Sequence, residues 1–389
     1  MYADVADTLL FWEWFHLGLL PVTVHQMDEL GSTLPMSEWG YFVGFNRIVG
    51  GIRLRQTRSV HSDCESRLMS EFYNVECFPF ESSTTRAFGL PACSGNETTD
   101  DLSTADCYDA SAYSAVDFLH DEGFSVEDGS TTREFEFWLD TLEPSERISE
   151  RVHYLEERRW IDRQTKTAIV ELLLYNGQSE PLMCEVLLEF EFHRTGLVAA
   201  TSMIESVPVM PYQNHLALKL ALEVAYAWIV VSIAWEESRQ IAQAAAKSDL
   251  RKALRSHFYS SEAAFGNWIS ALNVLFGVFL VGVWIPFVLQ LDLVTYDLAH
   301  LHRPEGLATY VDDDSDAWSK FHHEIVEIED ELSHAINEMK AIRLLGGLNI
   351  LFVLARLLKD WTHIPALRVV AVTLWKSIAR LATFSIIVV

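Results

Sequence analysis

Residues 267–290 read NWISALNVLFGVFLVGVWIPFVLQ and include no charged side chain. Because an α-helix rises about 1.5 Å per residue, a run of this length can cross the ~30 Å hydrocarbon core of a bilayer. The alternative is the core helix of a soluble protein, but such helices are usually shorter. The stretch therefore predicts a transmembrane helix and decides the architecture of the second half of the chain.

Three more apolar runs accompany this stretch, and they cover residues 215–235, 344–358 and 381–389. The first carries Lys219 and Glu223 near its start, where a helix end at the membrane interface tolerates charge. The last reaches only about 14 Å as a helix, so it cannot complete a span. We expect an all-α transmembrane bundle, similar to a voltage sensor, over residues 213–358. Over residues 359–389 we expect an interfacial linker helix and the start of a pore helix.

The charges of the connecting segments predict how these helices are oriented. Basic residues gather between the first two spans and after the third, at Arg239, Lys247, Arg251, Lys252, Arg255, Lys359, Arg368, Lys376 and Arg380. Residues 295–340, a connecting loop between the second and third spans, are instead strongly acidic. Because positively charged short loops stay on the cytosolic side, residues 295–340 and residues 1–212 should both lie outside.

Residues 1–212 have the chemistry of a domain outside the cytosol. Four of the chain's cysteines lie close together there, as expected of disulfides in an oxidising compartment, and they are Cys64, Cys77, Cys93 and Cys107. Asn96 begins an Asn-Glu-Thr sequon, which predicts a glycosylation site. Residues 1–24 lack the basic start of a signal peptide, so we expect a membrane helix to precede them in the natural protein.

Two segments of this domain alternate with the period of a half-buried strand. They are residues 52–57, where arginines alternate with apolar or amide side chains, and residues 184–192, where glutamates do so. Residues 145–159 place Ile148, Val152 and Leu155 on one side of a charged helix. The predicted fold of the domain is therefore α+β, with an antiparallel sheet and helices.

Composition excludes several classes of function. The chain has 389 residues with a formal net charge of −26 and a pI near 4.8, which argues against nucleic-acid partners because these require clustered Lys and Arg. The sequence contains no Gly-rich phosphate loop and no nucleophilic serine elbow. We therefore expect neither an enzyme nor a cofactor. A membrane enzyme stays as an alternative that a cleft of conserved polar residues would favour.

No metal site is predicted either. Asp312, Asp314 and Asp316 have the first spacings of a calcium loop, but the glycine and the bidentate glutamate that such a loop requires are missing. The histidines and glutamates of residues 322–327 do not form His-Glu-x-x-His. Cys184 lies in a predicted strand and is interpreted as a buried thiol rather than a nucleophile.

The order of several motifs resembles one known family. Residues 160–165, Trp-Ile-Asp-Arg-Gln-Thr, are followed by a strand ending at residues 174–176 and then by Cys184 and Phe190. This series is similar to the Trp-Leu-Asp-Arg-Gly-Thr segment, and the strands after it, of the polycystins among the transient receptor potential channels.

Other parts of the chain are similar to the same family. Residues 47–58, RIVGGIRLRQTR, lead into Cys64 and Cys77 and resemble the family's basic strand and disulfide-bonded pair. Residues 11–14, Phe-Trp-Glu-Trp, resemble the helix that follows the first transmembrane span. Residues 235–237 and the segment around Trp268 and Asn273 resemble parts of the second and third helices.

The resemblance implies a six-helix subunit of a tetrameric cation channel, with the external domain covering the pore. Residues 1–389 would then hold that domain, transmembrane helices two to four and the start of helix five, and alone would carry no current. The family pairs Cys64 with Cys77, and Cys93 with Cys107 is the expected second bridge. Arg356 and Lys359 match two basic residues of the fourth helix, which could sense voltage or simply anchor its cytosolic end.

The resemblance also implies partners and a location. The partners would be membrane lipid and other polycystin subunits, in homo- or hetero-tetramers that transport cations such as calcium. A multi-pass protein in the plasma membrane of a cilium or flagellum is expected. The alternative from another class is a non-conducting anchor whose external domain binds extracellular proteins or filaments, which a long adhesive segment upstream would favour.

Overall fold

The computed structural model describes residues 5, 7–28, 30–59, 64, 77–78, 134–178, 180–247, 249–260, 264–306, 315–361, 369, 373 and 377. These residues belong to two compact units. The sheet unit comprises residues 1–210 and 294–333, and the helical unit comprises residues 211–293 and 334–389. An α+β unit and a helical unit are the two parts that the sequence predicts.

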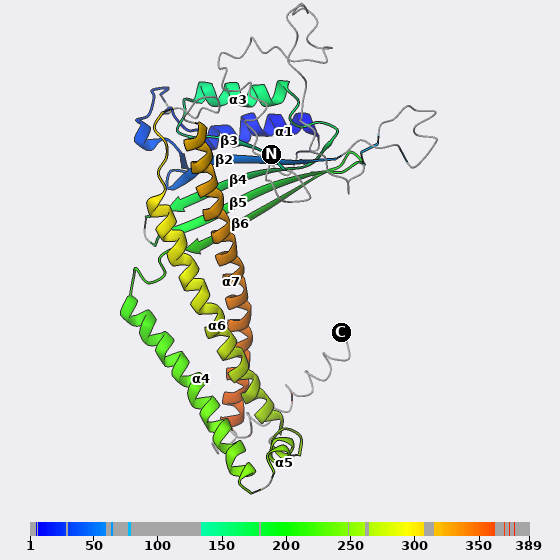
Figure 1. The fold of residues 1–389 in the computed structure, drawn as a ribbon, viewed down its shortest axis with the longest axis vertical. Coiled ribbons are helices and arrows are strands. Elements are labelled where there is room, and N and C mark those ends of the chain that lie inside the picture. The colour runs from blue at the N-terminus through cyan, green and yellow to red at the C-terminus, as the bar shows by residue number, and fades with distance from the viewer. Residues whose placement is uncertain are drawn as a thin grey trace, which may run out of the picture. The chain divides into compact units, whose positions relative to one another are not determined.

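An antiparallel sheet forms the centre of the sheet unit (Figure 1). Its strands run in the order β1 (Tyr41–Phe42), β2 (Asn46–Arg58), β4 (Thr165–Asn176), β5 (Leu182–Phe192) and β6 (Val198–Pro208). Strand β3 (Glu134–Leu139) also pairs with β2. Both segments with a strand-like period, residues 52–57 and 184–192, therefore lie in strands as predicted.

Helices cover one face of this sheet. The N-terminal helical segment consists of α1 (Thr8–Trp14), the π-helical turn η2 (Phe15–Leu19) and α2 (Leu20–Thr23), and it is joined on this face by α3 (Ser145–Glu157) (Figure 1). Alternation along the strands aims Ile52 and Leu54 into the core between the layers. As predicted, α3 buries Ile148, Val152 and Leu155 there.

The opposite face of the sheet is covered as well, by the last residues of α6 (Ala264–His300) and the first part of α7 (Ser315–Trp361). A small apolar cluster of Trp138, Trp318, Phe321 and Ile325 fills this second layer. The prediction that β2 has only one buried face is thus wrong, because Arg53 on its other side is also buried. Arg53 and Arg55 face a second layer that only the tertiary fold supplies.

Much of the segment interpreted as a connecting loop, residues 295–340, is helical from Ser315 onward. The physical reason is an apolar stripe beneath the acidic surface, in which residues 318, 321, 325, 328 and 332 recur at helical spacing and are all buried. Asp312 and Asp314, for which the sequence predicts no calcium site, lie outside the described residues.

The helical unit contains α4 (Leu216–Ala245), α5 (Leu250–Arg255), the π-helical turn η8 (Ser256–Ser260) and most of α6 and α7. Polar side chains pair inside it: Tyr226 donates to the Asn349 side chain at 3.1 Å, and Asn349 donates to the backbone oxygen of Asn273 at 3.0 Å. Two of the described helices, over residues 216–245 and 266–300, are long and apolar enough to cross a membrane.

Candidate functional site

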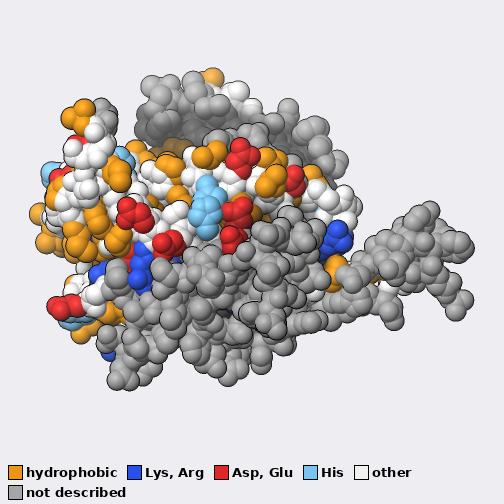
Figure 2. All heavy atoms as spheres, turned by 90° about the horizontal axis from the view of Figure 1, so that it is seen from above, with side chains coloured by type: hydrophobic (Ala, Val, Ile, Leu, Met, Phe, Trp, Pro, Cys, Tyr) orange, Lys and Arg blue, Asp and Glu red, His pale blue; other side chains and the backbone are white. Residues whose placement is uncertain are grey.

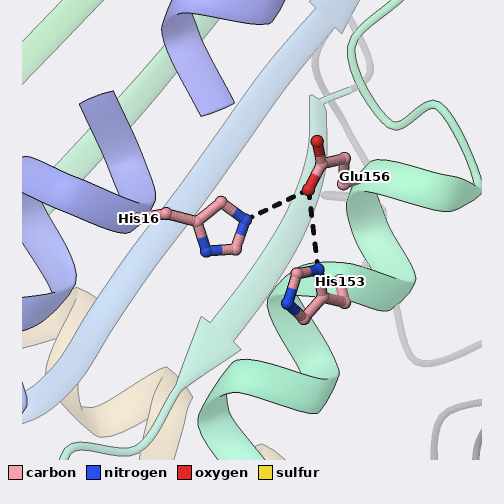
Figure 3. A group of neighbouring side chains, drawn as sticks. All are labelled: His16, His153 and Glu156. Carbon is pink, nitrogen blue, oxygen red and sulfur yellow. Dashed lines mark hydrogen bonds and ion pairs between the residues drawn. The ribbon is translucent and has the colours of Figure 1, made fainter. Parts of the chain in front are cut away.

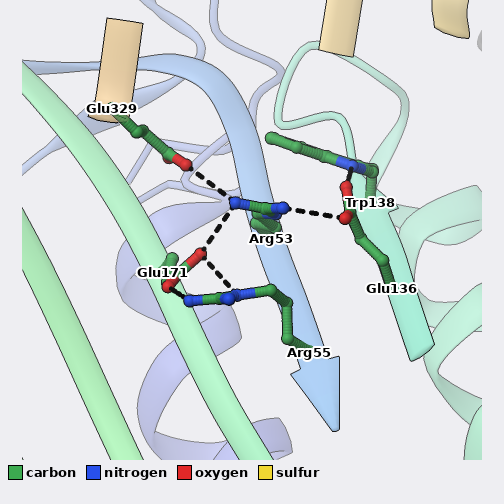
Figure 4. Close-up of polar contacts among 6 residues, drawn as sticks. All are labelled: Arg53, Arg55, Glu136, Trp138, Glu171 and Glu329. Carbon is green, nitrogen blue, oxygen red and sulfur yellow. Dashed lines mark hydrogen bonds and ion pairs between the residues drawn. The ribbon is translucent and has the colours of Figure 1, made fainter. Parts of the chain in front are cut away.

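A group of charged side chains lies between the sheet and the first part of α7, and it is centred on Arg53 (Figure 4). The Arg53 guanidinium donates to Glu136 of β3 at 2.8 Å, to Glu171 of β4 at 3.3 Å and to Glu329 of α7 at 3.2 Å. Together with Arg55, which also donates to Glu171, these residues are called the Arg53 cluster. One buried arginine of β2 thus binds three other elements of the sheet unit, β3, β4 and α7.

Strand geometry explains why these residues meet. Arg53 and Arg55 are two positions apart on β2, so both side chains point to the same face of the sheet. Antiparallel pairing sets Arg53 opposite Glu171 on β4 and next to β3, whose Glu136 is opposite Arg55. Glu329 completes the group from the helix packed against that face.

The Arg53 cluster contains one more carboxylate than guanidinium groups, and its members are buried or nearly so. Burial first, and then repulsion by the Glu171 carboxylate, raise the pKa of Glu329 to about 8, against the attraction of Arg53 and Arg55. Glu329 therefore carries a proton for much of the time near neutral pH, and the cluster can lose that proton in mildly alkaline solution.

Aromatic rings cover the cluster. The Trp138 ring stacks on His322 with centroids 4.5 Å apart and an angle of 3° between the planes, while its indole N–H donates to Glu136. Arg53 lies over the same Trp138 ring at 5.6 Å. Burial, followed by the positive charges of Arg151 and Arg53, lowers the pKa of His322 to about 3, so this ring is neutral and packs as an aromatic group.

A second ion pair holds the segment before α7 on the same unit. Arg303 donates from Nε to Asp140 at 3.0 Å, and its guanidinium lies 5.0 Å from the centre of the Trp318 ring. Asp140 directly follows β3, so this contact lies at the end of the strand that supplies Glu136. Charged and aromatic contacts therefore bind Arg303 and the first part of α7 to the sheet at more than one point.

Two glycines allow this close approach. The pairing of β2 with β4 shifts register between Val49 and Ile52, which makes a bulge at Gly50 and Gly51. Both have positive φ, +79° and +109°, which only glycine adopts at no steric cost. A Cβ on Gly50 would lie 2.2 Å from Cδ1 of Ile325, so the absence of a side chain leaves room for α7.

The raised pKa of Glu329 makes the stability of the sheet unit depend on pH. Its pKa is higher in the folded protein, about 8, than in the unfolded chain, about 4.3, so the folded state binds more protons between these values. The resulting stabilisation is fully present below about pH 4.3 and is lost as pH rises through about 8. We expect the unfolding midpoint of wild type to fall further between pH 5 and pH 9 than that of Glu329→Gln.

The measurement is thermal unfolding followed by tryptophan fluorescence at several pH values. Glu327→Gln is the matched control, because Glu327 lies on the same helix with its side chain 65% exposed. It should follow the wild-type curve. A constant difference between Glu329→Gln and wild type across this pH range would show that Glu329 does not titrate as described.

The site residues predicted from the sequence lie apart from the Arg53 cluster. Cys64 and Cys77 form a disulfide with their Cα atoms 5.1 Å apart, the pairing that the resemblance implies. Cys184 is a free, half-buried thiol in β5, and burial raises its pKa above the usual value. Cys93, Cys107 and Asn96 lie outside the described residues.

Arg356 and Lys359 lie near the end of α7, in the helical unit. Arg356 donates to the Ser270 hydroxyl of α6 at 3.5 Å. Their role, in voltage sensing or in anchoring the helix end, stays a prediction.

Sequence reasoning missed the Arg53 cluster. Its carboxylates are 83, 118 and 276 positions from Arg53, so no local spacing connects them. The available signal was the pair of arginines on one face of a predicted strand, because two charges on a strand face need either solvent or carboxylate partners.

Comparison with known families finds one match. Residues 135–210 match the polycystin domain, and this range holds nearly all of β3 and the whole of α3, β4, β5 and β6. Glu136 and Glu171 of the Arg53 cluster fall inside the match. A comparison with curated proteins found no match.

Proposed function

This chain is a polycystin-family protein, and from that premise we propose that it is a subunit of a tetrameric cation channel whose sheet unit lies outside the cytosol and covers the pore. The family consists of channels rather than enzymes. In the proposal the subunit assembles with itself or with other polycystin subunits, carries a glycan on Asn96 and resides in the plasma membrane of a cilium or flagellum.

The observation that carries the proposal is the presence of a polycystin domain and two apolar helices in one chain. The apolar side chains of these helices are largely exposed within the chain itself, for example Trp228 at 71% and Phe279 at 56%. A core helix of a soluble protein would bury such side chains. Lipid and neighbouring subunits are the surroundings that suit them.

Helix α7 supplies the residues for a response to voltage in this proposal. Helix α7 contributes Glu329 to the sheet unit and Arg356 and Lys359 to the helical unit, so one helix carries both the bond to the sheet and the basic pair. In the proposal, movement of α7 under voltage changes the contact with Arg53. One charge crossing the full membrane field corresponds to about 2.3 kcal/mol per 100 mV.

The test is current recording from cells that express the natural protein containing these residues, alone and with another polycystin subunit. A cation current is expected, and Arg356→Gln should shift its voltage dependence, whereas Arg239→Gln at an exposed position of α4 should not. Surface protein that conducts only with the second subunit would assign it an accessory role in the channel. Surface protein without cation current in either case would overturn the proposal.

A further inference from the structure

Two histidines and a glutamate converge on the helical face of the sheet unit, away from the Arg53 cluster (Figure 3). His16 lies in the π-helical turn η2, and His153 and Glu156 lie on α3. His16 Nε2 is 3.1 Å from Glu156 Oε2, and His153 Nδ1 is 3.7 Å from the same oxygen. One ligand atom from each residue can be chosen so that all three atoms lie within 4.8 Å of one another.

These distances are close to those of a metal site. A tetrahedral zinc ion with ligands at about 2.0–2.1 Å separates neighbouring ligand atoms by about 3.3 Å. The two nitrogen–oxygen distances lie on either side of this value. Rotation of the side chains would bring the three ligand atoms, now within 4.8 Å of one another, to this spacing around one ion.

Local structure favours the arrangement. His153 and Glu156 are three residues apart on α3, so they share one face of the helix. His16 comes from a π-helical turn, a departure from regular helix that is frequent at functional sites. The two imidazole rings already stack with centroids 4.8 Å apart, and both point toward Glu156 in Figure 3.

The position is open to an ion from solution. The side chain of His153 is 58% exposed, and those of Glu156 and His16 are partly exposed. In the view of Figure 2, histidine side chains reach the surface with acidic side chains beside them. Three protein ligands with solvent access leave a fourth position for water, the pattern of an open zinc site.

We propose that His16, His153 and Glu156 form a binding site for a divalent transition-metal ion of the zinc type. Two imidazoles and one carboxylate select zinc, copper or nickel over calcium and magnesium, which take oxygen ligands. The bound ion links the N-terminal helical segment to α3, because its ligands His16 and His153 come from these two elements and are 137 positions apart in the sequence. Sequence analysis predicts no metal site because the ligands are so far apart in the chain.

The test uses the whole chain purified in detergent and titrated with Co²⁺, whose visible absorption reports tetrahedral ligands, and with Zn²⁺ in competition. We expect Zn²⁺ to displace one equivalent of Co²⁺ and to raise the unfolding midpoint. His153→Ala and Glu156→Gln should each weaken binding of that equivalent at least tenfold, since even the loss of a residue supporting a metal ligand costs 10–100-fold. His16→Ala should weaken binding of that equivalent by a similar factor.

The matched control is His323→Ala. His323 also lies one turn from a glutamate, Glu327, at 3.6 Å and with an exposed side chain, but no third ligand joins them among the described residues. Its replacement should leave the affinity within twofold of wild type. Because His153 is exposed, His153→Ala should fold normally, and unchanged binding in that variant or an equal loss in His323→Ala would overturn the proposal.

Discussion

Replacing Arg53 with alanine is expected to lower the midpoint of thermal unfolding of the sheet unit by about 10 °C. The substitution leaves Glu136, Glu171 and Glu329 buried with one guanidinium fewer. Removal of one partner of a buried ion pair typically costs about 3–5 kcal/mol, and each kcal/mol lowers the midpoint of a domain of this size by about 2–4 °C. Tryptophan fluorescence measures the transition.

Two variants separate the ion pairs from a general effect of losing an arginine. Arg163→Ala removes an exposed arginine of the same unit and should change the midpoint by less than about 2 °C. Arg53→Lys keeps the charge but loses the planar fork that reaches three carboxylates, so an intermediate decrease is expected. If Arg53→Ala unfolds within 2 °C of wild type, the cluster does not stabilise the fold as described.

Replacing Gly51 with alanine is expected to prevent normal folding of the sheet unit. Its φ of +109° is unfavourable for any residue with a Cβ, and that Cβ would lie 2.4 Å from the backbone oxygen of Leu139. Backbone strain of this kind costs about 1–3 kcal/mol before the clash is counted. The yield of monodisperse protein in size-exclusion chromatography should fall at least tenfold.

Gly50→Ala is the comparison for Gly51→Ala, because the added Cβ at position 50 would clash with a side chain rather than with backbone. The added Cβ meets Cδ1 of Ile325 at 2.2 Å, and Ile325→Ala removes that atom. The double variant Gly50→Ala/Ile325→Ala should therefore lose less stability than the sum of the two single variants. Additive losses would contradict the close contact between the bulge and α7, and normal yield of Gly51→Ala would contradict the bulge itself.

Local patterns predicted the elements of the sheet unit that have one buried face and one charged face. Strand β5 and helix α3 have the periods that the sequence analysis found, because their apolar residues face a single core. Strand β2 has the predicted period too, but both of its faces are covered, since Arg53 on its second face is also buried. The polycystin resemblance of residues 160–190 agrees with the family match over residues 135–210.

The remaining features depend on tertiary contacts. The sequence predicts a loop for the first part of α7, because acidic residues there outnumber the apolar stripe that is buried only by the second face of the sheet. Arg53 was not recognised as a site residue because its partners come from three distant elements. The sequence predicts no site at His16 and His153 for the same reason, because they are far apart in the chain.

The central claim is that the sheet unit is the external part of a membrane-spanning channel subunit, and labelling of intact cells tests it most directly. In a Cys184→Ser background, which itself is the blank for labelling of the remaining cysteines, one cysteine is added at a time at an exposed position. The positions are Leu197 in the turn after β5, Lys320 on α7 and Lys247 after α4. A membrane-impermeant thiol reagent should label the first two in intact cells and Lys247→Cys only after permeabilisation. Labelling of Lys247→Cys in intact cells, with protection of the other two, would contradict the account.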